Sequence, residues 1–315
     1  MNYRDIRTAA AERMTSAQTD PHRQSLIYAG AALGLSVLIT VINFLLSRQL
    51  ESTGGLAGIG MRSVLTTAQS VLSFASLILL PFWDAGYRHS CLQLARGKRL
   101  WSDMLLEGFR RWGVVLRLNL LRGLLFTAIG FVCLQAAGML YMLSPFSMPA
   151  MEAMSEIMES ADPAAMEQAM EAVLPMLIPI YVIFAVVLLA VLIPVSYRLR
   201  LADMFIIDER CGARIAMLES NRRMKGHCVQ YFRLDLSFWW YFLAQLAVTA
   251  VAYGDLALNA LGVAIHPDVS YFLFFGISAL GQFLLIWRCA PMVFTAHALA
   301  YETLTPEEEP LKIEN

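Results

Sequence analysis

Apolar residues gather along the chain in six long stretches, and a polar segment separates each stretch from the next. Each stretch has roughly the 20 mostly apolar residues that a membrane-crossing helix needs. The six stretches are Leu26–Leu46, Val64–Trp83, Leu118–Leu140, Leu174–Tyr197, Phe238–Leu258 and Tyr271–Pro291. The first begins too far into the chain, and is too long, for an ordinary cleaved signal peptide. The pattern therefore predicts an all-α, polytopic membrane protein with about six transmembrane helices.

The basic residues lie on one side of these predicted spans. Arginine and lysine concentrate before the first span, between the second and third, and between the fourth and fifth. The opposite side has only Arg48 and Arg62, and its long loop, residues 144–173, holds six acidic residues and no basic one. Because cytosolic loops of membrane proteins are enriched in lysine and arginine, we expect both termini to lie in the cytosol.

The composition agrees with this interpretation. Hydrophobic residues make up 58% of the chain and charged residues 16%, whereas soluble domains carry about 25% charged residues. The net charge is −1. Because no overall positive charge would attract nucleic acid, we expect no nucleic-acid partner.

The polar segments define the predicted domain organisation. Residues 1–25 form a cytosolic amphipathic segment, and residues 26–300 form a six-span membrane domain. Residues 301–315 form an acidic, proline-broken tail that we expect to be disordered. Two inner loops, residues 84–117 and 198–237, lie within the membrane domain, together with the acidic, methionine-rich outer loop.

The first inner loop and the outer loop carry helical signals of their own. The inner loop has Leu94, Leu105 and Phe109 among basic residues, with Gly97 as a break, which predicts two short amphipathic helices near the headgroups. The outer loop also predicts two short helices, the second beginning at Asp162–Pro163. Its methionines recur at helical spacing, which favours an apolar packing face; a copper(I) site is the alternative.

The second inner loop contains the clearest amphipathic helix, from Arg210 to Lys225. One face holds Arg214, Leu218, Asn221, Arg222 and Lys225, and the other holds Ala213, Met217, Ser220 and Met224. Gly226 follows where a left-handed C-cap glycine belongs, and an aromatic run then leads into the fifth span. We interpret Arg214, Arg222 and Lys225 as an interaction face. Its cations either contact anionic lipid headgroups or bind a cytosolic protein or phosphate-bearing ligand.

Two ionisable residues near the inner membrane surface are candidates for an ion pair. Arg288 lies within the sixth span near its inner end, and because this span runs toward the cytosol, the Arg288 side chain tilts toward the membrane centre. Asp84 lies at a similar depth at the inner end of the second span. We predict an Asp84–Arg288 pair; the alternative is a shallow Arg288 in contact with water or phosphate.

No catalytic or metal-binding constellation is evident in the sequence. The five cysteines and five histidines are scattered, without the spacing of a zinc site. The chain has no Walker A glycine loop. His297 lies near the inner end of the sixth span with Glu302 close by, but no acid–histidine cluster accompanies them. We therefore expect no enzymatic activity, no metal and no cofactor.

Several motifs together resemble a known family. They are Tyr197–Arg198, Ser220–Arg222, Met224–His227 and Leu234–Trp240, the N-terminal "YRDIRTAAAERM", and the inner-loop residues Gly86, Ala95–Gly97, Asp103–Leu105 and Gly108–Phe109. Their pattern is similar to that of the uncharacterised bacterial integral membrane proteins of domain-of-unknown-function family 975 (DUF975). The chain departs from the family in having Pro194–Val195 where Pro-Gly is usual, and in its methionine-rich outer loop. The resemblance implies a multi-span helical fold in a bacterial membrane and supplies no catalytic residue.

Together these features predict a multi-pass protein of a bacterial plasma or inner membrane. We expect a non-enzymatic, lipid- or envelope-related accessory or scaffold protein that contacts anionic lipid headgroups and possesses a surface for a cytosolic protein. The alternative is a transporter or permease-like subunit, coupled to a cytosolic ATPase through its basic inner-loop helices. No ATPase motif lies in this chain, so that alternative requires a partner.

Overall fold

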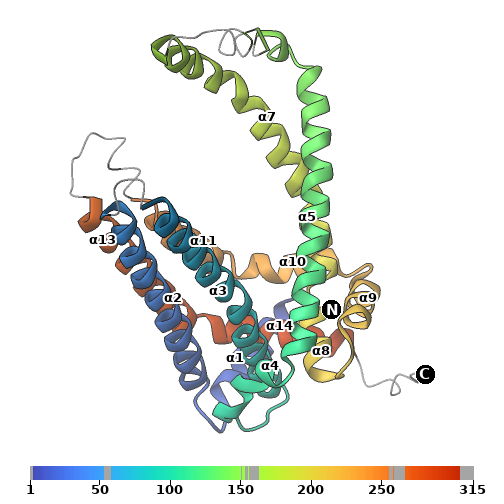
Figure 1. Ribbon diagram of the computed structural model, residues 1–315. Helices are drawn as coiled ribbons and strands as arrows, with labels where there is room; N and C mark the ends of the chain where they lie inside the picture. Colours follow the sequence, from blue (N-terminus) through green and yellow to red (C-terminus); the bar gives the residue numbers. More distant parts are fainter. Residues whose placement is uncertain are drawn as a thin grey trace. The chain divides into compact units, whose positions relative to one another are not determined.

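The computed structural model consists of helices joined by short turns and loops in the part of the chain that it describes (Figure 1). The described residues are 3–52, 58–149, 151–152, 155, 163–254, 258 and 267–305, and none of them lies in a β-strand. The helices are α1 (Tyr3–Thr15), α2 (Pro21–Ser52), α3 (Gly58–Ala95), η1 (Ser102–Leu106), α4 (Glu107–Arg110), α5 (Trp112–Met142), α7 (Pro163–Arg198), α8 (Ala202–Asp208), α9 (Ala213–Met224), α10 (Cys228–Ser237), α11 (Trp239–Val251), α13 (Pro267–Arg288) and α14 (Ala290–Leu304).

Long apolar helices correspond to five of the six predicted spans. In the described part of the chain, five helical segments are long and apolar enough to cross a membrane, and few side chains are buried in the most apolar 18-residue stretch of each. They are Pro21–Gln49, Ser63–Ala95, Trp112–Met142, Ile178–Asp208 and Val269–Arg288. The predicted fifth span differs, because α10 and α11 meet at Phe238 with a bend of 69° and pass the same test only as a pair. The described helices therefore provide five or six candidate spans.

Helix α7 corrects the prediction for the outer loop. A separate short helix was expected after Asp162, which itself lies outside the described residues. The helix does begin at Pro163, but it continues to Arg198 and so joins the end of the outer loop to the predicted fourth span. Pro175, Pro179 and Pro194 lie inside it. Proline lacks a backbone N–H, so each of them removes one helical hydrogen bond without ending the helix here.

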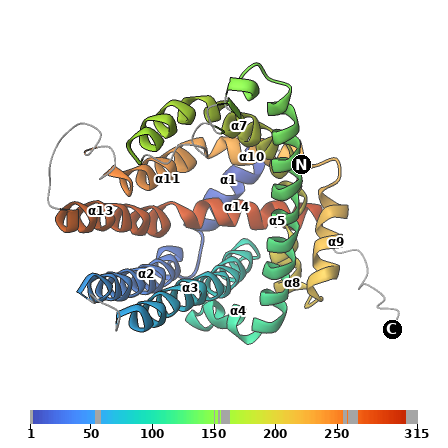
Figure 2. The same cartoon turned by 45° about the horizontal axis from the view of Figure 1, so that its top comes forward.

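The chain divides into two compact units, which we describe separately. Residues 119–200 form one unit, built from most of α5 and from α7. Within it, the Nη2 of Arg122 donates to the carbonyl of Leu199 at 3.2 Å. The other unit comprises residues 1–118 and 201–315. In this unit α13 and α14 follow one another through the middle, with α2 and α3 on one side and α1, α10 and α11 on the other (Figure 2).

The buried core of the larger unit surrounds α14 and the end of α3. Tyr87, Cys91, Leu105 and Ala290 form a cluster whose side chains are almost fully buried. Most of α14 is buried as well, including Tyr301 and Leu304. The helix therefore extends into the tail predicted to be disordered from residue 301, while residues 306–315 lie outside the described ranges.

The first inner loop packs into this core. Gly97 adopts a positive φ of 70° after α3 and breaks the helix, as predicted. Leu94 and Leu105, however, are buried inside the protein rather than turned outward. Gly86 explains the close packing, because a Cβ there would collide with the backbone carbonyl of Leu105. The expected pair of short headgroup helices is thus replaced by the continuous end of α3 and the short η1 and α4 packed against it.

Candidate cationic surface and polar networks

Helix α9 has the two faces that the sequence predicts, although it is shorter at its start, running from Ala213 to Met224. The predicted polar face is exposed throughout, at Arg214, Leu218, Asn221, Arg222 and Lys225. The opposite face holds the buried Ala213, Ala216, Ser220 and Met224. Gly226 has a φ of 86°, which is the left-handed conformation expected of a glycine that ends a helix.

The cations of this face are available for contact. The side chain of Arg222 is 78% exposed and lies 3.8 Å from Glu219, an arrangement that contributes little because solvent screens it. Within the described residues, neither Arg214 nor Lys225 lies within ion-pair distance of a carboxylate. Ile215 and Leu218 are exposed on the same side of the helix. The surface is therefore a mixed one, basic and apolar.

The inner side of α9 is fixed to the rest of the larger unit. The Nε of Arg223 donates to Glu219 at 2.7 Å, and its Nη1 donates to the carbonyl of Leu304 at the end of α14, at 3.3 Å. The backbone N–H of Leu201 donates to the hydroxyl of Ser220 at 3.1 Å. These bonds join α9 to α14 and to the start of α8, so the exposed face has a defined orientation.

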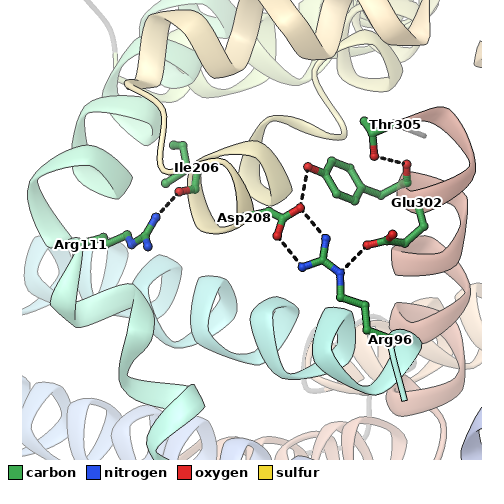
Figure 3. A network of polar contacts seen from close by, with 7 residues as sticks. Arg96, Arg111, Ile206, Asp208, Glu302 and Thr305 are labelled. Carbon is green, nitrogen blue, oxygen red and sulfur yellow. Dashed lines mark hydrogen bonds and ion pairs between the residues drawn. The ribbon is translucent and has the colours of Figure 1, made fainter. Parts of the chain in front are cut away.

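A second feature is a network centred on Arg96, directly after α3 (Figure 3). Its Nη1 and Nη2 each donate to one carboxylate oxygen of Asp208 at 2.6 Å, and its Nε donates to Glu302 at 2.7 Å. The hydroxyl of Tyr301 donates to the same Asp208 at 3.2 Å. Bidentate arginine–carboxylate pairs are among the strongest hydrogen-bonded pairs in proteins. The network therefore holds together the ends of α3, α8 and α14.

The electrostatics of this region favour a fixed network. The hydrogen bonds that Arg96 donates to Asp208, with the negative charge of that carboxylate, raise the pKa of Arg96 above its ordinary value, so Arg96 remains charged. Burial raises the pKa of Tyr301 well above its usual value, so its hydroxyl remains a donor. Burial also raises the pKa of Glu209, and it raises that of the Cys211 thiol to about 11. A raised pKa leaves less of the Cys211 thiol as thiolate, which is the reactive form of cysteine.

A third feature is a buried pair between α10 and α14. The Nε2 of His297 lies 2.6 Å from the Oδ1 of Asp235, and both side chains are less than a tenth exposed. The ring of Tyr231 stacks on His297 with a centroid distance of 5.4 Å. The sequence singled out His297 but not its partner. The available signal was the "LDLSFWW" motif, which contains Asp235 within an otherwise apolar run.

The predicted Asp84–Arg288 pair is not formed. The carboxylate of Asp84 accepts a hydrogen bond from the Nε of Arg88 at 2.8 Å, one helical turn away on α3. Arg88 also lies 3.5 Å from Asp203 of α8. The Nη1 of Arg288 lies 3.4 Å from the Nε2 of His22 instead. Similar depth did not decide the pairing, because a partner four residues away on the same helix was already within reach.

No metal cluster occurs among the residues that the structure describes, where no three or more His, Cys, Asp or Glu side chains are grouped to hold an ion. In the outer loop, Met148 and Met151 are exposed, whereas Met154 and Met158 lie outside the described residues. The described polar residues form an exposed cationic face on α9. They also form the Arg96 network and the Asp235–His297 pair, which hold helices together.

A family comparison agrees with the motifs noted in the sequence. Residues 1–306 match the model of the family described as "Protein of unknown function (DUF975)". The chain belongs to this family. No curated protein and no solved structure matches the chain. Membership in DUF975 covers all three features described above, since Arg96, the α9 face and the Asp235–His297 pair all lie within the matched residues.

Proposed function

We propose that this protein is a multi-pass protein of the bacterial plasma membrane with both termini in the cytosol. Its role is that of a non-enzymatic, lipid- or envelope-related accessory or scaffold protein. Two observations support the membrane placement. The long helices leave large apolar side chains exposed, such as Leu124 and Val186, and water would disfavour that exposure. Outside the spans, the lysine and arginine residues concentrate before the first span, between the second and third, and between the fourth and fifth, with only Arg48 and Arg62 in the other loops.

The exposed face of α9 is the observation that carries the lipid-related role. Arg214, Arg222 and Lys225 surround the exposed Leu218, and Ile215 lies at the margin. Such a mixed surface fits the boundary of an anionic leaflet, where cations meet phosphates and apolar side chains reach between headgroups. Each cation near such a surface contributes about 1 kcal/mol. Three of them would contribute about 3 kcal/mol, which corresponds to roughly a hundredfold in affinity.

The test compares two triple variants of the intact protein in mild detergent. One variant replaces Arg214, Arg222 and Lys225 by glutamine. The control variant replaces three exposed cations that lie outside α9, also by glutamine: Arg23, Lys98 and Arg110. Retained phosphatidylglycerol is measured by native mass spectrometry against phosphatidylcholine. We expect the α9 variant to lose preference for the anionic lipid and the control to keep most of it. Equal losses in the two variants would contradict the assignment to α9.

A transporter or permease-like subunit is the second candidate. What favours it is the bonding of α9 to both α8 and α14, because a docking helix must be rigidly joined to the helices that it moves. A cytosolic nucleotide-binding subunit would then occupy the same exposed face. Purification from native membranes in mild detergent discriminates between the two roles. A nucleotide-binding subunit that is lost with the α9 variant favours transport, and lipid alone favours the accessory role.

A further inference from the structure

Helix α10 has apolar side chains on both of its faces. Tyr231 and Leu234 point into the protein and are almost fully buried. On the opposite side Val229, Phe232 and Leu236 are 63%, 47% and 57% exposed. Their spacing of three and four residues places them in one stripe along the helix. We name these three residues the α10 stripe. A helix in water exposes a polar face, so this stripe requires an apolar surrounding.

The α10 stripe has a fixed direction because the inner face of the helix is held. Asp235 pairs with the buried His297 of α14 at 2.6 Å. At the end of α10, the Nη1 of Arg7 donates to the carbonyl of Ser237 at 3.3 Å, and its guanidinium lies 5.7 Å from the centroid of the Phe238 ring. Rotating the stripe inward would break the buried pair. The stripe of α10 therefore keeps one direction relative to α14.

The orientation of α10 relative to α11 indicates which apolar environment surrounds the α10 stripe. The two helices meet at Phe238 with a bend of 69°. If α11 runs along the membrane normal, this bend leaves α10 about 21° from the membrane plane. Trp239 and Trp240 lie at the bend and are exposed, and tryptophan prefers the boundary between membrane and water. Arg233 is exposed beside the stripe, where its long side chain can reach the headgroups.

We propose that α10 is an in-plane membrane anchor, whose Val229–Phe232–Leu236 stripe lies between the headgroups and the acyl chains of the cytosolic leaflet. This inference rests on the proposed membrane placement and adds to it a lipid contact distinct from the cationic face of α9. The occupant is lipid rather than a protein, because the stripe is continuous with the apolar α11 and is bordered by Trp239 and Trp240. The predicted entry into the fifth span is thus a surface helix followed by a sharp turn.

The depth of spin labels in nanodiscs tests this proposal. Single cysteines at Val229, Phe232 and Leu236 of the full chain are labelled with a nitroxide, in a background without the native cysteines. The accessibility of each label to oxygen and to a water-soluble nickel complex gives its depth. Leu246 of α11 serves as the deep reference and Asn221 of α9 as the polar reference, since both are exposed on the protein.

The expected result is a shallow depth that is nearly constant along the stripe. Val229 and Leu236 lie about 10 Å apart along the helix axis. A tilt of about 21° makes their depths differ by about 4 Å. A steady change of about 10 Å would mean that α10 crosses the membrane as half of a broken span, and would overturn the proposal. The proposal would also be overturned if the labels on the stripe were as accessible to the nickel complex as the label at Asn221, while the label at Leu246 remained deep in the membrane. If Leu246 is also in water, the proposed membrane placement itself fails.

A second measurement does not depend on removing the native cysteines. A photo-reactive phenylalanine analogue is placed at Phe232 or Leu236, and its adducts are identified by mass spectrometry after irradiation in native membranes. Lipid adducts at both positions support the anchor. Adducts only with a second copy of the chain, or only with another protein, would show that the stripe is a protein interface and would overturn the proposal.

Discussion

Replacing Arg96 by glutamine should destabilise the protein, because the Arg96 network joins three helices. The change leaves Asp208 and Glu302 without their cation, and both are only partly exposed. Hydrogen bonds to charged groups contribute about 1.5–3 kcal/mol each, and removing one partner of a fully buried pair costs about 3–5 kcal/mol. Since this network is partly open to solvent, we expect a loss of about 3 kcal/mol.

The free energy of unfolding is measured by titrating the protein in mild detergent micelles with dodecyl sulfate and following the loss of helix. Arg110→Gln is the matched control. Its side chain is 62% exposed and lies 3.4 Å from Glu107, a surface pair that contributes about 0–1 kcal/mol. Arg96→Lys should fall between the two, because lysine keeps the charge but cannot bind Asp208 through two donors.

A double variant, Arg96→Gln with Asp208→Asn, tests the pairing itself. If the two residues interact as the structure shows, the double variant should lose about 1–2 kcal/mol less than the sum of the two single variants. Additive losses would mean that Arg96 and Asp208 do not act through each other. A loss for Arg96→Gln no larger than that for Arg110→Gln would show that this network does not hold the helix ends together.

Three further predictions concern single positions. Gly86→Ala should cost about 1–3 kcal/mol, since its new methyl meets the Leu105 carbonyl, whereas Gly30→Ala, in open space within α2, should be neutral or stabilising in the same titration. Asp235→Asn should cost about 1–3 kcal/mol by weakening the buried pair with His297, and an unchanged unfolding midpoint would contradict that role. Alkylation of Cys211 should keep accelerating between pH 9 and about 11, because its thiol has a pKa of about 11 and only the thiolate reacts; peptide-resolved mass spectrometry would detect a plateau near pH 9 if this is wrong.

The sequence predicted the features that depend on neighbours along the chain. The two faces of α9 follow from helical periodicity, and the positive φ of Gly226 follows from the glycine after the last turn. The long apolar helices were predicted because length and hydropathy are local properties. These patterns need no knowledge of the tertiary fold.

The polar networks could not be predicted in the same way. Arg96 and Glu302 are separated by 206 residues, and Asp235 and His297 by 62. The sequence around one residue of each pair does not indicate which distant residue is its partner. The Asp84–Arg288 prediction was wrong because it considered depth alone, while Arg88 lay one turn from Asp84 on the same helix.

The bend at Phe238 was also missed, for a different reason. Hydropathy places the junction at Phe238, because α10 contains Gln230, Arg233 and Asp235 whereas α11 is strongly apolar, but it gives no angle between the two helices. The turn depends on how Phe238 and Tyr231 are buried in the core, which is a tertiary property.

The side of the membrane on which α9 lies decides whether its cationic face can contact the cytosolic leaflet. Cysteines introduced at Asn221 of α9 and, separately, at Ser155 of the outer loop are treated in intact cells with a membrane-impermeant maleimide. We expect the cysteine at position 155 to be labelled at once and the one at position 221 to be labelled only after the inner membrane is permeabilised. Labelling at position 221 in intact cells would contradict the cytosolic placement of the cationic face and, with it, the proposed contact with the cytosolic leaflet.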